Sequence, residues 1–359
     1  MKIKLYLPGA YFLGAMAIIP TLYAAPLAKN DLIVIDDLFI KTKPQCVGIY
    51  IVDVPESFDN RTHIATYDDF KIESKFIDLP AFEQRMKLRE QALHDAINRP
   101  ENEPDNSPFI KEIIRLPDNQ GVIFDKNKNG YDDIYRKLEA HVYLNPIAFI
   151  ITTDFRDFSD KKNEERKKHY LERGFTEAES NQKPAKLAAM RSLISRLNGR
   201  LNHDLPTQKG VCIPNGFISD DGRNHKVVIG FSYKNDDFLL GINTDNTRIA
   251  DGDTFFERND VINDALKNLN MKTLKKYAAM ANSIPFEAWL FNGVQDNRQK
   301  MLQVYDFTLY ANEAVATASK PRVTIGLDSK YKYTRYSEAQ MVEIWDRIVG
   351  SLRYKPSAF

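Results

Sequence analysis

Short stretches in which apolar residues alternate with polar ones recur along most of this chain. They predict β-strands, because successive side chains of a strand face opposite sides of a sheet. The first runs from Cys46 to Val54, where Val47, Ile49 and Ile51 are apolar and Pro55 ends the pattern. Similar patterns predict strands at residues 68–79, 109–116, 121–125, 131–143, 148–152, 227–233, 238–243, 286–292, 303–310 and 322–327. Strands that follow one another at such short intervals indicate antiparallel sheets.

Other stretches repeat their apolar residues every three or four positions, which predicts helices with one buried face. Such helices are expected at residues 81–98, 157–173, 184–201, 260–280 and 337–352. The last is the clearest, because Ser337 is a suitable N-terminal cap. Its apolar stripe consists of Met341, Ile344, Trp345, Ile348 and Leu352.

The chain divides into two halves that resemble each other. The second half opens with GVCIPNGFI (residues 210–218), which shares a cysteine, a glycine, an aromatic residue and an isoleucine with CVGIYIVDV (residues 46–54). Each half ends in a predicted helix, and 359 residues suit two domains better than one. The predicted fold class is therefore α+β, with two related domains, each an antiparallel β-sheet backed by helices. We place these domains at residues 25–204 and 205–359.

The N-terminus resembles a secretory signal peptide. Lys2 and Lys4 precede an uncharged run, and small residues at Ala24 and Ala25 provide a cleavage site. Cleavage after Ala24 avoids placing Pro26 at the new N-terminus, so residues 1–24 are the predicted signal peptide. The alternative is an uncleaved membrane anchor, since the run is long enough to span a bilayer. We favour cleavage, and so expect an exported protein with no stable membrane insertion once the signal is removed.

Charge and motifs exclude several functions. The chain has 50 Lys and Arg against 49 Asp and Glu, so it lacks the basic excess typical of nucleic-acid binding. It contains no H-E-x-x-H, G-x-G-x-x-G or P-loop motif, and its six histidines are not spaced as metal ligands. We therefore expect no enzymatic activity and no cofactor, and we assign no catalytic, cofactor-binding or metal-binding residues.

The segment Asp125–Asp133 (DKNKNGYDD) has two interpretations. Its opening resembles a calcium-binding loop, but Arg136 stands where such a loop needs a bidentate glutamate. Asn129 and Gly130 are instead the pair preferred in a tight β-hairpin. We favour the hairpin.

The two cysteines, Cys46 and Cys212, also leave two possibilities open. In an oxidising compartment they can form a disulfide that connects the two halves. Alternatively, both are buried free thiols, since free cysteine is among the most buried residue types. We slightly favour the disulfide.

Three groups of residues together resemble the two-domain periplasmic immunity proteins that protect against type VI secretion lipases. The resemblance spans nearly the whole mature chain, and depends mainly on the two cysteine-glycine openings at this separation. Its motif residues are Cys46, Gly48, Tyr50, Asp53 and Pro55 in the first opening, Cys212, Gly216, Phe217 and Ile218 in the second, and Trp345, Ser351, Leu352, Arg353 and Pro356 near the C-terminus. We assign structural roles to Gly48, Tyr50, Asp53, Pro55, Gly216, Phe217, Trp345, Arg353 and Pro356. The closing helix is also similar to that of PsbP-like domains.

The resemblance implies that the protein is periplasmic, and that it binds a cognate phospholipase effector there and occludes it. Tyr331, Tyr333, Arg335 and Tyr336 are candidates for the contact surface, although the same segment also suits an edge strand or an exposed loop. An alternative function is that of an exported envelope module that binds a lipid or a secreted protein, or has a structural role.

Overall fold

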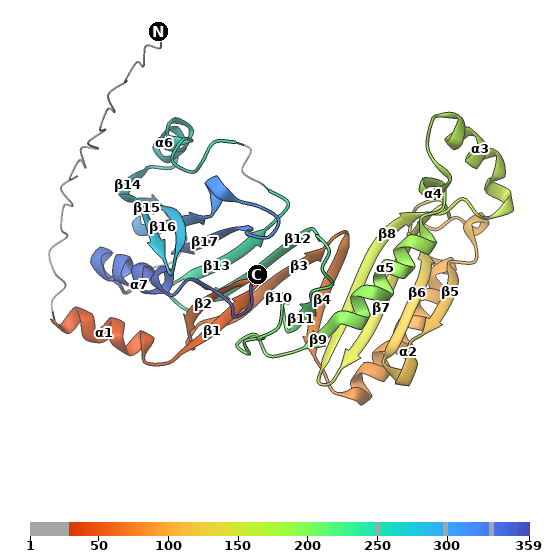
Figure 1. Ribbon diagram of the computed structural model, residues 1–359, viewed down its shortest axis with the longest axis horizontal. Helices are drawn as coiled ribbons and strands as arrows, with labels where there is room; N and C mark the ends of the chain where they lie inside the picture. Colours follow the sequence, from red (N-terminus) through yellow and green to blue (C-terminus); the bar gives the residue numbers. More distant parts are fainter. Residues whose placement is uncertain (1–28, 249–251, 297–300, 330–333) are drawn as a thin grey trace, which may run out of the picture.

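One large antiparallel sheet runs through both lobes of the molecule (Figure 1). The computed structural model describes residues 29–248, 252–296, 301–329 and 334–359. In spatial order the twelve strands are β14 (Met271–Ala281), β15 (Ile284–Asp296), β16 (Met301–Ala311), β17 (Arg322–Asp328), β13 (Leu239–Asp245), β12 (Val227–Lys234), β3 (Asp59–Tyr67), β4 (Phe70–Phe76), β8 (Ile147–Arg156), β7 (Tyr135–Leu144), β6 (Gly121–Asn127) and β5 (Ile110–Arg115). The first seven form the C-terminal lobe and the last five the N-terminal lobe. The structure confirms the predicted α+β fold class.

In the N-terminal lobe, two helices cover opposite faces of the sheet. They are α2 (Leu79–His94) and α5 (Lys183–Arg196). On β6, Ile123 belongs to the same apolar cluster as Met190 of α5, whereas its neighbour Phe124 packs with Leu93 of α2. Because adjacent residues of a strand face opposite sides, the sheet lies between the two helices. The predicted helix at 81–98 begins slightly earlier, where the Asp78 side chain accepts a hydrogen bond from the backbone of Ala81 at 2.8 Å.

Between β8 and α5 the chain leaves the sheet and forms two short helices, α3 (Glu164–Glu172) and α4 (Glu177–Ser180). In Figure 1 they stand at the end of the N-terminal lobe farthest from the C-terminal lobe. Short 3₁₀ turns occur at Asp95–Asn98, Pro104–Asn106, Pro117–Asn119, Lys161–Asn163 and Glu313–Val315.

The C-terminal lobe is backed by α7 (Glu338–Gly350), close to its predicted position. Ser337 and Gln340 form a reciprocal capping box at its start, and Trp345 is fully buried on its inner face. A helix that the sequence patterns did not predict, α1 (Lys29–Phe39), packs on α7, and Asp36 lies 2.8 Å from Arg347. A further helix, α6 (Asn259–Asn268), packs against β14.

Two small antiparallel sheets lie where the halves of the sequence meet. One contains β1 (Thr42–Val47), β2 (Tyr50–Pro55) and β18 (Arg353–Tyr354). The other contains β9 (Leu197–Gly199), β10 (Gly210–Ile213) and β11 (Gly216–Ser219). The first sheet therefore joins segments from opposite ends of the chain.

Two predicted elements were wrong. The single strand at 46–54 is a hairpin, because Gly48 adopts a φ of 62° and reverses the chain between β1 and β2. The helix predicted at 260–280 ends at Asn268. Asn270 takes a left-handed conformation with a φ of 52°, and the chain continues as edge strand β14, whose backbone pairs with β15.

The strands do not follow the order of the two halves. β3 was not predicted, and it pairs with β12 from Asp59 to Tyr67 before it turns into β4. The N-terminal half thus contributes a strand to the C-terminal lobe, and the lobes are connected by hydrogen-bonded backbone as well as by the linker.

Candidate functional site

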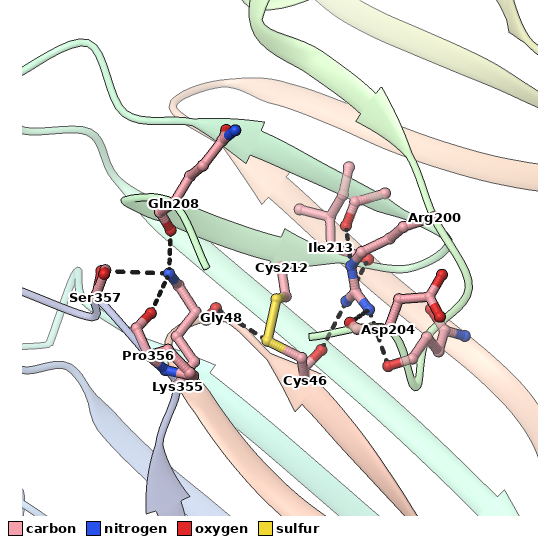
Figure 2. The surroundings of a disulfide bond; sticks show 12 residues. Cys46, Gly48, Arg200, Asp204, Gln208, Cys212, Ile213, Lys355, Pro356 and Ser357 are labelled. Atoms are coloured by element: carbon pink, nitrogen blue, oxygen red, sulfur yellow. Dashed lines mark hydrogen bonds between the residues drawn. A yellow bond between two sulfur atoms is a disulfide. The ribbon is translucent and has the colours of Figure 1, made fainter. Parts of the chain in front are cut away.

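A disulfide bond joins Cys46 of β1 to Cys212 of β10 at the meeting point of the two halves (Figure 2). The sulfur atoms are 2.05 Å apart, both cysteines are fully buried, and Phe217 packs against them. Beside the bond, Gly48 and Cys212 exchange two backbone hydrogen bonds of 2.9 and 2.8 Å. Of the two possibilities that the sequence left open, the structure has the disulfide.

The motif glycines allow close approach of neighbouring elements. A Cβ atom on Gly48 would lie 2.6 Å from a methyl carbon of Thr244, and one on Gly216 would lie 2.9 Å from the ring of Phe149. Next to Gly48, the buried Tyr50 hydroxyl donates a hydrogen bond to the carbonyl of Pro321. Burial raises the pKa of Tyr50 well above its usual range. These motif residues therefore pack the junction, as structural residues do.

Arg200, which no sequence motif singled out, is the hydrogen-bonding centre of this junction. Its buried guanidinium donates to the carbonyls of Cys46 at 3.0 Å and Gly216 at 2.9 Å, and also to the carbonyls of Leu201, Asn202 and Asp204. It thereby joins β1 and β11 to the loop between the halves. Figure 2 shows Arg200 between Cys46 and Asp204. Burial lowers the pKa of Arg200 to about 10. An isolated arginine at the end of a predicted helix carries no sequence signal for this role.

Lys355 fastens the C-terminal segment to the same junction. Its ammonium donates to the carbonyls of Gln208 at 2.5 Å, Pro356 at 3.1 Å and Ser357 at 3.3 Å (Figure 2). It also lies 5.4 Å from the centre of the Phe217 ring. Only 3% of Lys355 is exposed, and burial lowers its pKa to about 8.

Two further motif residues, Asp53 and Arg353, join β2 to the C-terminal strand β18. Arg353 makes two hydrogen bonds to Asp53, at 2.9 and 3.0 Å, and Pro55 ends β2 opposite Thr42. Trp345 lies apart from the disulfide, within the core of the C-terminal lobe, where its indole N–H donates to the hydroxyl of Tyr277 at 3.1 Å.

A cavity of about 530 Å³ lies beside the junction and is lined by polar and apolar residues, among them Gly48, Lys209 and Phe359. His225 on its wall has both ring nitrogens 2.8 Å from carboxylates, one of Asp68 and one of Asp221. Partial desolvation raises the pKa of Asp221, but its hydrogen bonds with His225 and Arg223 outweigh this and hold the pKa well below its usual range. The contact with Asp68 joins the loop before β12 to the turn after β3, and the contact with Asp221 lies within that loop.

The candidate contact residues near the C-terminus divide into three cases. Tyr331 and Tyr333 lie outside the described residues. Arg335 is exposed and lies 3.2 Å from Asp237. Tyr336 is only 5% exposed, and its ring stacks on that of Phe238 with 5.2 Å between the centroids.

The segment resembling a calcium loop is a hairpin connection between β6 and β7, in which Gly130 has a φ of 73°. Asp125 is fully buried and its carboxylate is paired with Arg136, whose Nε lies 2.9 Å away, and with Lys183 at 2.8 Å. Throughout the described part of the chain, no three His, Cys, Asp or Glu side chains are grouped so as to hold a metal ion.

The described residues thus form two lobes that are held together by the disulfide, the hydrogen bonds of Arg200 and the shared sheet. None of the described helices has the length and apolar character needed to cross a membrane. Such an arrangement is suited to binding another macromolecule without rearrangement of its own backbone.

Solved structures of immunity proteins share this fold. The apo structure of the immunity protein TplEi of the type VI secretion system from Pseudomonas aeruginosa matches with a TM-score of 0.65 and 17% identity, over 88% of this chain and 98% of that one. TplEi complexed with "L" peptide matches with a TM-score of 0.61 and 18% identity over the same shares. A crystal structure of a Tle4–Tli4 complex contains a chain that matches with a TM-score of 0.66 and 17% identity, again over 88% and 98%. At these identities the likeness shows the fold.

The family is shown by sequence models that cover both halves. The N-terminal domain of Tle cognate immunity protein 4 matches residues 43–200, and the C-terminal domain of the same family matches residues 204–357. The chain therefore belongs to the Tle cognate immunity protein 4 family, which confirms the resemblance inferred from the motif residues. A comparison with curated protein sequences finds no match.

Proposed function

We propose that this protein binds a type VI secretion phospholipase effector in the periplasm and occludes it, so that the producing cell is not damaged. The observation that carries the proposal is the match of both halves to the immunity family, over residues 43–200 and 204–357. We also propose that residues 1–24 are removed on export, and that residues 25–204 and 205–359 are the two immunity domains.

The inhibition proposed here involves no chemistry by the immunity protein. A lipase needs an open path to its nucleophile and freedom of its lid, so a partner that covers that path stops turnover. The junction supports this role, because the disulfide, Arg200 and the shared sheet limit relative movement of the lobes. A protein whose lobes move little relative to each other loses little conformational entropy on binding, and this favours a tight complex.

The alternative of a lipid-binding module has weaker support. The cavity beside the junction is lined in part by Lys209, Asp220 and Arg223, and charged side chains are unfavourable neighbours for an acyl chain. We therefore prefer a protein partner.

The test uses the mature chain from Ala25 and the phospholipase effector encoded beside its gene. Binding is measured by calorimetry, and phospholipid hydrolysis is measured with increasing amounts of the immunity protein. We expect a stoichiometric complex and loss of hydrolysis at equimolar ratio. An active lipase that neither binds nor slows would contradict the proposal. A lipase effector from a different immunity pair is the specificity control.

A further inference from the structure

We infer that an exposed row of aromatic rings around Arg156, at the far end of the N-terminal lobe, is a surface through which this protein binds its effector. We call it the distal aromatic surface and define it by Tyr131, Tyr135, Arg156, Tyr170 and Phe175. The inference rests on the proposed function and names part of the interface. Tyr135 and Arg156 are the first residue of β7 and the last of β8, next to the excursion that carries α3 and α4 (Figure 1).

The row is continuous. Tyr135 and Arg156 are partners in the β7–β8 register, and the guanidinium of Arg156 lies 5.8 Å from the centre of the Tyr135 ring and 4.9 Å from that of Tyr170. One arm of the guanidinium donates to the Tyr170 hydroxyl at 2.5 Å. The Tyr170 ring stacks on Phe175 with 4.1 Å between centroids, and Tyr131 meets Tyr135 at 5.9 Å. These contacts hold the rings in place before any partner arrives.

Much of this row faces outward. Tyr131 is 54% exposed, Tyr135 is 36% exposed and Phe175 is 42% exposed. Tyr135 is exposed because α2 covers the same face of β7 only farther along the strand. There Arg89 of α2 lies 2.6 Å from Glu139, and Phe82 stacks on Tyr143. Tyr135, at the start of the strand, lies four residues before Glu139 on that face.

Charge makes Arg156 the centre of the surface. Its neighbours are already paired: Lys128 lies 2.8 Å from Asp154, and Arg166 lies 2.8 Å from Asp132. Among the described residues, Arg156 forms no ion pair within 4.0 Å: Glu179 interacts with it only at longer range, and its guanidinium donates to the uncharged Tyr170 hydroxyl. A guanidinium that is held between two rings and makes no direct ion pair can bind a carboxylate of a partner by donating two parallel hydrogen bonds to it.

This chemistry specifies the partner. Tyrosine and arginine dominate the residues that carry the energy of protein–protein interfaces, and stacked rings lose little rotamer freedom on binding. The occupant is therefore an acidic segment of the effector, with a carboxylate on Arg156 and apolar side chains on Tyr135 and Phe175.

The experiment compares three variants, Tyr135→Ala, Arg156→Gln and Phe175→Ala, with Phe76→Ala as the matched control. Phe76 is 46% exposed and ends β4 in the same lobe, outside the distal aromatic surface. Affinity for the effector is measured by surface plasmon resonance, and circular dichroism and melting temperature check folding. We expect each of the three variants to raise Kd at least tenfold and the control to raise it less than threefold. Arg156→Gln should also weaken the salt dependence of binding, and Arg156→Lys should be intermediate.

A second readout needs no substitution. On binding the effector, backbone amides of residues 128–135 and 164–180 in the wild-type chain should exchange with deuterated solvent more slowly. If the wild type inhibits the lipase but the three variants bind within threefold of it and these amides are unprotected, the surface is not part of the interface, and the proposed function stands. If the wild type neither binds nor inhibits an active effector, both conclusions fail.

Discussion

Removal of the Cys46–Cys212 disulfide is expected to cost this protein a large part of its stability. The bond closes a loop of 166 residues, and the entropy lost by the unfolded chain on such closure corresponds to about 5 kcal/mol. Measured effects often fall below this value, so we expect the free energy of unfolding to decrease by about 3–5 kcal/mol in the double variant Cys46→Ser, Cys212→Ser. Whole domains are typically stable by only about 5–15 kcal/mol.

The assay is urea unfolding followed by tryptophan fluorescence and circular dichroism. Because both cysteines are fully buried, serine also places two hydroxyls in an apolar site, and this adds its own penalty. The wild-type chain unfolded with and without a reductant provides the control, since it breaks the cross-link without any substitution. Both comparisons should give a loss of at least about 3 kcal/mol, and the serine variant should lose more because of its two buried hydroxyls.

A loss below about 1 kcal/mol in the reduced wild-type chain would refute the reasoning. It would mean that the unfolded chain keeps the two halves together without the bond. A large loss in the serine variant alone would assign the effect to side-chain packing around Phe217 instead of loop closure.

Three further predictions concern the same junction. Arg200→Met should lower the free energy of unfolding by about 3 kcal/mol or more, because several buried carbonyls lose their donor; a urea midpoint equal to that of the wild type would contradict this. Lys355 has a pKa of about 8 in the folded state, against about 10.4 in the unfolded state. The unfolded state therefore binds more protons between these values, and the free energy of unfolding should rise by up to about 2 kcal/mol from pH 8 to pH 10. Urea unfolding at several pH values should show this slope in the wild type and not in Lys355→Met, and equal slopes would count against the buried amine. The Asp53–Arg353 pair is about one-third exposed, so a double-mutant cycle with Asp53→Asn and Arg353→Gln should give a coupling of about 1 kcal/mol or less, and a coupling above about 3 kcal/mol would show that the pair acts as a buried one.

Local patterns were sufficient for much of the fold. The stripe of Met341 and Trp345 with a serine cap predicted α7 nearly to the residue, because helix capping and helical periodicity are properties of neighbouring residues. The pattern was misleading at residues 260–280. There apolar spacing continued past Asn270, while the left-handed turn at that residue and the hydrogen bonds of β15 made the segment a strand.

The candidate site was only partly accessible from the sequence. The motif glycines and cysteines were recognised by their type and separation, whereas Arg200 and Arg156 stood in no motif. The role of each arginine depends on the groups that the fold places around it. Arg200 donates to backbone carbonyls as far apart in the sequence as those of Cys46 and Gly216. Arg156 lies between the rings of Tyr135 and Tyr170.

The sequence by itself determined the α+β class, most helices and strands, the family resemblance and the two residues able to form a disulfide. The tertiary structure alone decided that Cys46 and Cys212 meet, that β3 pairs with β12, and that the lobes share one sheet. The reason is physical. Periodicity records which face of an element is buried, whereas strand partners more than 150 residues apart are selected by the packing of the whole chain.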